Sequence, residues 1–338
     1  MKAAFVKVPF QTELRNLPMP EPGPSEVLVR VLACGVCGTD LHNARDLARQ
    51  EAVPVGHEFC GVIQRVGPGV SSFHEGEEVV VENHTALGAS AAAKNGQLVD
   101  STDLYITMTQ PCMAEMVKTH VLALHRNKSL SPEAGALTEP LTVALDLVES
   151  SDIGLGSTVA IFGAGPIGLM ALRLVRMKGA ALVAVTQPSH SKARIELARK
   201  LGADLVIASD SGDVVESLRA MYPPGFDRIL VTAPPEAIPS AIRVARFGAI
   251  VTFNGISYNR PAVSFDANEF HFKRLQLRAT HSIPNLRFPL AISLLERREI
   301  DAADFVTHTF PFARVGEALR VAENDKEHVI KVVVRMDQ

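Results

Sequence analysis

Residues 157–186 decide the fold, and they read STVAIFGAGPIGLMALRLVRMKGAALVAVT. A short apolar run leads into a glycine-rich turn, a run with helical periodicity follows, and a second apolar run comes after it, so the stretch predicts strand, turn, helix and strand. A G-x-G-x-x-G pattern in that setting is typical of dinucleotide binding. Its first glycine permits the tight turn, its second lets a pyrophosphate approach the backbone, and its third lets helix and strand pack closely, while the helix N-terminus supplies N–H donors. We therefore predict that the turn binds a dinucleotide through Gly163, Gly165, Pro166, Ile167 and Gly168.

The same alternation continues downstream. A helical run and an apolar run follow in SKARIELARKLGADLVIA (191–208), and further apolar runs occur in FDRILVTA (226–233), GAIVTFNG (248–255) and LQLRATHS (275–282). Apolar strands that alternate with helices indicate a parallel sheet covered by helices on both faces. We therefore assign residues 152–285 to a doubly wound α/β domain.

The residues that would contact the 2′ position of the coenzyme lie about 20 residues beyond the glycine turn. No Asp or Glu occurs between Leu182 and Arg194, where an NAD-binding protein usually has one; Ser189, Lys192 and Arg194 stand there instead. A 2′-phosphate would find donors and positive charge at these residues, so the segment slightly favours NADP(H) over NAD. The alternative is that Lys192 and Arg194 are only solvated charges of the following helix.

The N-terminal residues 1–151 have a different pattern of apolar residues, glycines and prolines. Short runs such as VLVRVLAC (27–34), GVIQRVGPGV (61–70) and GEEVVVE (76–82) lie between glycines and prolines, which predicts a β-rich domain. Residues 84–111 are small and polar, and we expect an irregular lobe there. We expect the tail, residues 286–338, to return to this first domain.

Composition limits the kinds of partner. The 338 residues include 34 basic and 37 acidic side chains, a net charge of −3, which gives no electrostatic footprint for nucleic acid or an anionic membrane. Four cysteines in a chain of this length do not form a disulfide framework, so we expect a reducing, cytoplasmic compartment. The N-terminal stretch lacks the apolar segment of a signal peptide, and no apolar run reaches the length of about 18 residues that spans a membrane. A small molecule is the expected partner.

A second set of residues predicts a metal site. Cys37 lies in CGVCGTDLH (34–42), His57 and Glu58 follow some twenty residues later, and Glu139 lies in LTEPLTVA (137–144). Thiolate, imidazole and carboxylate are zinc ligands, and three protein ligands with one open position are typical of a catalytic zinc. Closed structural sites are usually rich in cysteine, which this chain lacks. We expect zinc at Cys37, His57, Glu58 and Glu139, and the spacing leaves open which acid completes the shell.

In combination, the motifs CGVCGTDLH, GHEFCGVIQRVGPGV (56–70), LTEP and GAGPIG resemble the zinc-dependent medium-chain dehydrogenases/reductases, the superfamily of alcohol and sorbitol dehydrogenases. The resemblance covers essentially the whole chain, and FPLAISLLERREIDAADFVTHTFPF (288–312) is similar to the polyol branch. It implies a GroES-like catalytic domain plus a Rossmann domain, a homodimer or homotetramer, and NAD(P) as coenzyme. It also implies that Cys37 and His57 bind zinc, that Glu58 and Glu139 bind it directly or indirectly, that Thr39 accepts the substrate proton and that His42 passes it to solvent.

Besides the missing acid near the coenzyme 2′ position, two departures from the family pattern qualify the prediction. No cysteine occurs between Cys60 and Cys112, where many members hold a second, structural zinc, so we expect one zinc per chain. Polyol enzymes often carry an Arg-Tyr pair after the last Rossmann strand, where this chain has His281-Ser282-Ile283. We predict a zinc-dependent oxidoreductase that transfers hydride between NAD(P) and a secondary alcohol or ketone, with a polyol or sugar derivative as substrate. The alternatives are a dehydrogenase of simple secondary alcohols and a non-catalytic NAD(P)-binding protein.

Overall fold

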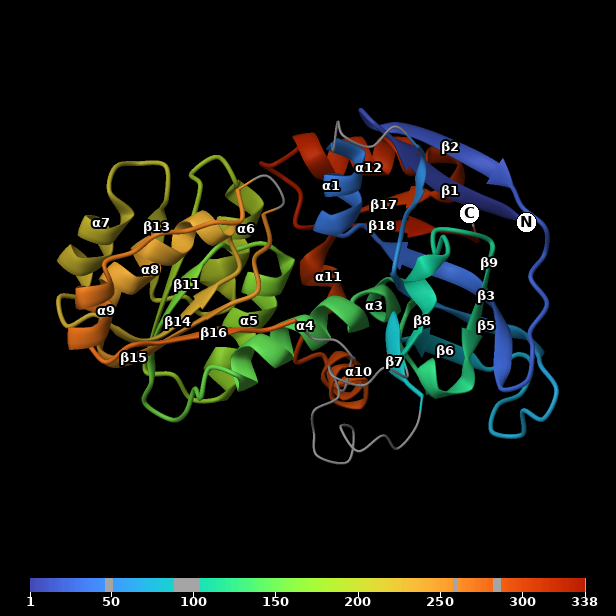
Figure 1. The fold of residues 1–338 in the computed structure, drawn as a ribbon, viewed down its shortest axis with the longest axis horizontal. Helices are drawn as coiled ribbons and strands as arrows, with labels where there is room; N and C mark the ends of the chain where they lie inside the picture. Colours follow the sequence, from blue (N-terminus) through green and yellow to red (C-terminus); the bar gives the residue numbers. More distant parts are fainter. Residues whose placement is uncertain (46–50, 88–103, 258–259, 282–286, 338) are drawn as a thin grey trace. The chain divides into compact units, whose positions relative to one another are not determined.

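A computed structural model describes residues 1–45, 51–87, 104–257, 260–281 and 287–337 (Figure 1). It divides into two compact units. The first comprises Met1–Thr142, Ser282–Asp325 and Lys331–Gln338, and the second comprises Val143–His281 and Lys326–Ile330. The domain limits expected from the sequence, 151/152 and 285/286, stay a prediction, since the compact units divide at 142/143 and 281/282.

The second unit is built on a six-stranded parallel sheet in the order β13-β12-β11-β14-β15-β16 (Figure 1). Its strands are β11 (Thr158–Phe162), β12 (Leu182–Gln187), β13 (Leu205–Ala208), β14 (Phe226–Val231), β15 (Ala245–Phe253) and β16 (Gln276–Ala279). In chain order this is 3-2-1-4-5-6, the order of a Rossmann fold. The parallel doubly wound sheet predicted from the sequence is therefore confirmed.

Helices connect these strands: α5 (Pro166–Met177), α6 (Lys192–Lys200), α7 (Val214–Met221), the short η4 (Pro235–Ala237) with α8 (Ile238–Val244), and α9 (Ala267–Phe272). All five side chains of β11 are buried, as expected for a strand covered on both faces. Apolar side chains from strands and helices form one cluster, which includes Ala160, Phe162, Leu218, Ile229, Ile242 and Val251. This core fixes the carboxyl ends of the strands, where the glycine turn lies.

The first unit contains a seven-stranded sheet in the order β10-β6-β5-β3-β18-β17, with β9 also paired to β3. The strands are β3 (Glu26–Gly35), β5 (Glu58–Val66), β6 (Glu78–Val81), β9 (Met116–His120), β10 (Leu124–Arg126), β17 (Val306–Pro311) and β18 (Lys331–Arg335). A three-stranded sheet is made of β1 (Lys2–Lys7), β2 (Gln11–Asn16) and β4 (Val53–Pro54). The C-terminal strand β18 lies beside β3, so the tail contributes directly to the sheet that carries Cys37 at its edge.

Helices in or near the first unit are α1 (Gly38–Arg45), α3 (Pro132–Ala136), α4 (Thr138–Glu149), α10 (Phe288–Glu296), α11 (Ala302–Phe305) and α12 (Val315–Asn324), with one-turn segments η2 (Thr107–Thr109), η3 (Val121–Ala123) and η5 (Phe312–Arg314). The hydroxyl of Ser131 accepts the N–H of Ala134 at 3.2 Å, and Pro132 occupies the first turn, so the predicted N-cap starts α3. Across the described ranges, the helices lack the combined length and apolarity needed to cross a bilayer.

The described parts of segment 84–111, which are its two ends, contain regular structure where the sequence predicted an irregular lobe. Strand β7 (His84–Ala86) pairs antiparallel with β8 (Leu104–Ile106), and η2 follows. The expectation was wrong at these ends, because three-residue strands are too short to leave a period-2 pattern in the sequence. Residues 88–103 of the expected lobe, and Ser282 and Ile283 of the later segment, lie outside the described residues.

Candidate active site

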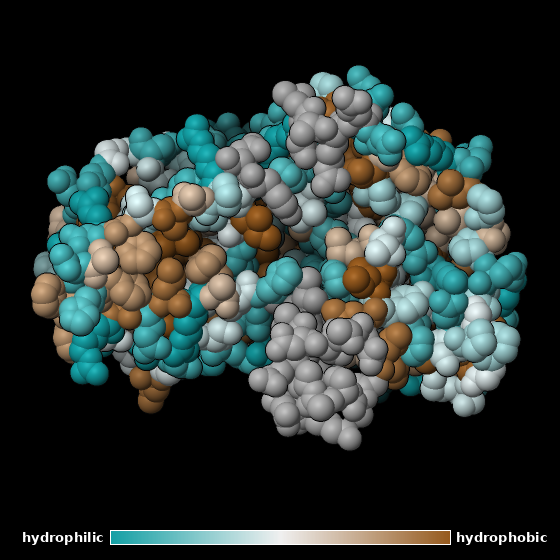
Figure 2. Space-filling model, in the orientation of Figure 1, coloured by the Kyte–Doolittle hydropathy of each residue, from teal (hydrophilic) through white to brown (hydrophobic). Residues whose placement is uncertain are grey.

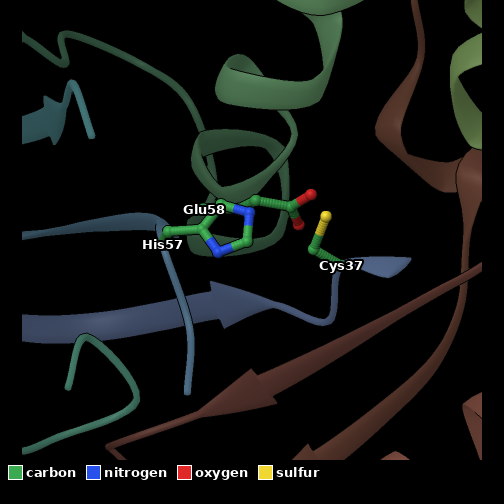
Figure 3. Close-up of side chains that lie close together, drawn as sticks. All are labelled: Cys37, His57 and Glu58. Carbon is green, nitrogen blue, oxygen red and sulfur yellow. The ribbon is translucent and has the colours of Figure 1, made fainter. Parts of the chain in front are cut away.

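Three predicted ligands converge in the first unit. One potential ligand atom from each of Cys37, His57 and Glu58 lies within 4.8 Å of the other two, and the side chains face one another (Figure 3). Cys37 follows β3, and Glu58 opens the antiparallel neighbour β5, where it pairs in register with Gly35. Residues some twenty positions apart therefore meet because two paired strands bring their ends together.

Asp40 fastens the two ligand-bearing loops together. Its Oδ2 accepts the N–H of Cys37 and its Oδ1 accepts the N–H of Gly56, both at 2.9 Å. Asp40 is buried, and burial raises its pKa although His57 and the two N–H donors act in the opposite direction. The carboxyl group therefore holds the backbone before His57 against the backbone of Cys37.

Glu58 forms an ion pair with Lys331 of β18, and both side chains are almost completely buried, at 2% and 3% exposure. Burial alone would lower the pKa of Lys331, but the Glu58 carboxylate and the Cys37 thiolate raise it above its ordinary value. Gly35 leaves room for the pair, because a Cβ at that position would overlap Glu58 Oε2. Sequence reasoning missed Lys331; the available signal was a single lysine inside the apolar run VIKVVV (329–334).

Glu139 lies beside this group rather than in it. The set of atoms within 4.8 Å of one another does not include Glu139, whose Oε1 accepts a hydrogen bond from Asn83 Nδ2 at 2.8 Å. Burial raises the pKa of Glu139 to about 7, and His57 opposes that rise. Burial alone would lower the pKa of His57, but Cys37 and the nearby carboxyl groups hold it well above its ordinary value. Asn83, which the sequence did not single out, thus fixes the second acid.

The donor set fits a zinc ion. A thiol, an imidazole and a carboxylate can approach one ion, and Cys37 is partly exposed while His57 and Glu58 are buried. The other three cysteines, Cys34, Cys60 and Cys112, are buried free thiols, and burial raises the pKa of Cys60 to about 12. Buried thiols of this kind stay protonated and are poor ligands.

The two residues predicted to carry the substrate proton lie on α1, next to Cys37. Thr39 Oγ1 is 3.8 Å from Cys37 Sγ, and both Thr39 and His42 are partly exposed. Residues three apart share one face of a helix, so His42 lies on the Thr39 side of α1. The structure thus places the Thr39 hydroxyl near the Cys37 sulfur, with His42 about one helical turn further along α1.

In the second unit, the glycine turn has the shape predicted for pyrophosphate binding. Gly163 has φ +104°, and a Cβ on Gly168 would overlap the Gly163 carbonyl oxygen, so both positions require glycine. A Cβ on Gly165 would meet nothing within 4 Å, which leaves the backbone open to a ligand. Pro166 and Ile167 then begin α5, whose first N–H groups are available as donors.

The residues expected near the 2′ position all have partners within the second unit. The N–H and hydroxyl of Ser189 donate to Asp210 at 2.8 and 3.0 Å. Lys192 Nζ lies 2.6 Å from Glu327 Oε1, and Arg194 Nε donates to the Val329 carbonyl at 3.0 Å. Because these groups are already bonded within the protein, the structure does not confirm the predicted preference for NADP(H).

Two protein-family models match the chain. The alcohol dehydrogenase GroES-like domain matches residues 23–126, and the zinc-binding dehydrogenase domain matches residues 166–297. Sorbitol dehydrogenase from Gallus gallus is 29% identical over 339 residues, which cover 96% of this chain and 93% of the relative. L-threonine 3-dehydrogenase from Pyrococcus horikoshii is 34% identical over 278 residues, 79% of each chain.

Solved structures agree with these matches. A structure described as a short-chain alcohol dehydrogenase from Escherichia coli CFT073, complexed with NADH, has a TM-score of 0.89 at 26% identity and covers 99% of each chain. A zinc-binding dehydrogenase from Sinorhizobium meliloti 1021, bound to NADP, has a TM-score of 0.87 at 28% identity and covers 99% of this chain and 98% of that one. With both family models in place and a relative above 30% identity across most of its length, the chain belongs to the zinc-dependent medium-chain dehydrogenase family, the family of alcohol and sorbitol dehydrogenases.

Proposed function

We propose that this oxidoreductase transfers hydride reversibly between NAD(P) and a secondary alcohol or its ketone, and that the substrate is a polyol or a sugar derivative. The observation that carries the proposal is the approach of Cys37, His57 and Glu58 to within 4.8 Å, with Cys37 partly exposed. Relatives named for sorbitol and for L-threonine support it, since both compounds carry a secondary hydroxyl next to other polar groups.

Cys37 and His57, with Glu58 or Glu139, would hold one zinc ion per chain. When bound, zinc supplies Lewis-acid polarisation of the substrate oxygen. The chain's own groups prepare this site. Asp40 fixes the loops of Cys37 and His57, Lys331 compensates the charge of Glu58, and Asn83 orients Glu139.

Proton transfer is assigned to α1. The Thr39 hydroxyl, 3.8 Å from the Cys37 sulfur, would accept the proton of the substrate hydroxyl. His42, on the same face of the helix, would then pass that proton towards solvent. The coenzyme pyrophosphate would lie on Gly163, Gly165 and Gly168, where the N-terminus of α5 provides N–H donors.

The ligand group argues against a non-catalytic NAD(P)-binding protein, because coenzyme binding alone does not require a thiol, an imidazole and a carboxylate within 4.8 Å of one another. A substrate panel separates the remaining alternatives: sorbitol, xylitol, L-threonine and propan-2-ol, each with NAD and NADP, with Cys37→Ser as a control. We expect the highest kcat/KM on a polyol and loss of activity in Cys37→Ser. Activity on propan-2-ol alone would favour the simple secondary-alcohol alternative, and coenzyme binding without turnover would favour the non-catalytic one.

We extend the proposal to a cytoplasmic homo-oligomer, a dimer or tetramer. Strand β16 is an edge strand of the six-stranded sheet, and the backbone N–H and C=O groups of an edge strand can pair with a strand of another chain. Phe247 and Phe272 are 66% and 73% exposed, and apolar residues gather on the second unit near α8 and α9 (Figure 2). Light scattering with size-exclusion chromatography tests this, and a monomer across a hundredfold concentration range would contradict it.

A further inference from the structure

Asp210 is bonded to Ser189, in the segment that would contact the 2′ position of the coenzyme ribose. Strands β12 and β13 are parallel neighbours, and Gln187 pairs in register with Ala208. Ser189 and Asp210 each follow these residues by two positions, so they emerge side by side at the carboxyl edge of the sheet. Rossmann proteins recognise the ribose 2′ position with residues about 20 positions beyond the glycine turn, which here means the end of β12 and Ser189.

The carboxylate of Asp210 uses both hydrogen-bond donors of Ser189. The Ser189 N–H donates to Oδ1 at 2.8 Å and the Ser189 hydroxyl donates to Oδ2 at 3.0 Å, while His190 Nδ1 lies 3.8 Å from Oδ2. The hydrogen bond from the Ser189 backbone holds the pKa of Asp210 below its ordinary value, so the group is a carboxylate at neutral pH. A 2′-phosphate would therefore meet a fixed negative charge and would have to displace it to gain the Ser189 donors.

The neighbouring cations do not offset that charge. Lys192 is paired with Glu327, and Arg194 Nε is bonded to the Val329 carbonyl. Because the Lys192 pair is exposed and such pairs are weak, it does not by itself exclude a phosphate. The negative charge of Asp210 is the larger obstacle, since like charges in close contact raise the cost of binding.

Gln187 occupies the position where the ribose-binding acid usually lies, and its side chain makes a different contact. Gln187 ends β12 and is buried, and its Oε1 accepts the N–H of Ala164 in the glycine turn at 2.7 Å. This side chain therefore supports the pyrophosphate turn. The carboxylate that contacts the segment after β12 is instead that of Asp210, which follows the neighbouring strand β13.

We infer that Asp210 is the residue that sets coenzyme preference, and that it selects NAD over NADP. Its carboxylate can accept a hydrogen bond from a ribose 2′-hydroxyl, and it repels a 2′-phosphate in the same place. This inference rests on the proposed function, in that the chain must bind a nicotinamide coenzyme. It reverses the slight preference for NADP(H) drawn from the sequence, which considered only the residues that directly follow β12.

The test compares Asp210→Asn with wild type in two measurements. Calorimetric titration gives the Kd of NADH and of NADPH without substrate, and steady-state rates give the ratio of kcat/KM for NAD to that for NADP. Asn keeps the shape of Asp and removes the charge, so we expect NADPH to bind roughly tenfold more tightly and the ratio to fall by about the same factor. Asp213→Asn is the matched control: it removes an equally exposed charge three residues away and retains an N-cap residue for α7.

The inference is supported if wild type prefers NAD and only Asp210→Asn shifts the preference. A wild type that prefers NADP, an Asp210→Asn protein with an unchanged NADH/NADPH ratio, or an equal shift in Asp213→Asn would overturn it. The proposed function survives those three results because coenzyme still binds. A wild type that binds neither coenzyme would overturn the proposed function and this inference together.

Discussion

At the scale of single residues, Gly35 tests how tightly the Glu58–Lys331 pair is packed. A Cβ at position 35 would overlap Glu58 Oε2 and lie 3.0 Å from Lys331 Cε, so Gly35→Ala has to displace a buried ion pair. We expect a loss of about 1–3 kcal/mol in the free energy of unfolding, measured by urea denaturation. Gly38→Ala is the control, since its Cβ would meet nothing within 4 Å. Equal stability of the two variants would show that the pair has more room than described.

Gly165 and Gly168 separate ligand binding from folding. Gly165→Ala adds a Cβ in open space, so we expect unchanged thermal stability and at least tenfold weaker binding of NADH, because the methyl group occupies the path of the pyrophosphate. Gly168→Ala places its Cβ against the Gly163 carbonyl and 2.8 Å from Thr232 Oγ1, so we expect a lower melting temperature even without coenzyme. Normal NADH binding by Gly165→Ala would argue against this turn as the pyrophosphate site.

The sequence predicted candidate ligands where metal chemistry requires a particular residue type, and their role as ligands stays a prediction. It singled out Cys37, His57 and Glu58, which the structure brings together. It missed their partners, because Lys331 lies in a strand near the C-terminus and becomes a neighbour of Glu58 only through the pairing of β18 with β3. Asp210 was missed for the same reason, since its contact with Ser189 depends on the adjacency of β12 and β13.

At the scale of secondary-structure elements, Glu26 links three strands. It opens β3, accepts the Tyr105 hydroxyl of β8 at 2.9 Å, and pairs with Lys118 of β9 at 2.9 Å. Burial alone would raise the pKa of Glu26, but Lys118, the Gly23 N–H and Tyr105 hold it below its ordinary value. Its stabilising effect is therefore full above the ordinary pKa of a glutamate and is lost as the pH falls through the lowered value.

Glu26→Gln should accordingly cost roughly 1.5–3 kcal/mol at pH 7, the usual range for hydrogen bonds to a charged group. The difference in melting temperature from wild type should stay constant above the ordinary glutamate pKa of 4.5 and shrink as the pH falls below it. Glu13→Gln provides a control, because its pair with Arg15 is exposed and we expect it to change stability by less than about 0.5 kcal/mol. A pH-independent effect of Glu26→Gln would mean that shape, rather than charge, is lost.

Elements could be predicted where they are long and strongly patterned. The β11–turn–α5 unit and the N-cap of α3 at Ser131 were both predicted from the sequence. The hairpin of β7 and β8 was not, because each strand has three residues and the hairpin depends on pairing rather than on propensity. Asn83, just before β7, owes its role to that local geometry, which places it 2.8 Å from Glu139.

At the scale of the whole molecule, chain length and the change of texture near residue 152 predicted two domains, and the structure has two compact units. The family could be inferred because two independent motifs, the metal-ligand motif and the dinucleotide-binding glycine turn, occur in one chain. The substrate could not, since side chains that line a substrate pocket come from loops whose arrangement no local pattern determines.

We infer that Cys37, His57 and a carboxylate hold one zinc ion per chain. Zinc content per chain, measured on purified wild type and on Cys37→Ser, tests it most directly, with Cys60→Ala as a control that removes a buried, protonated thiol. We expect one zinc ion per chain in wild type and in Cys60→Ala, and none in Cys37→Ser. Two zinc ions per chain, zinc retained in Cys37→Ser, or no zinc in folded wild type after zinc is added would contradict it.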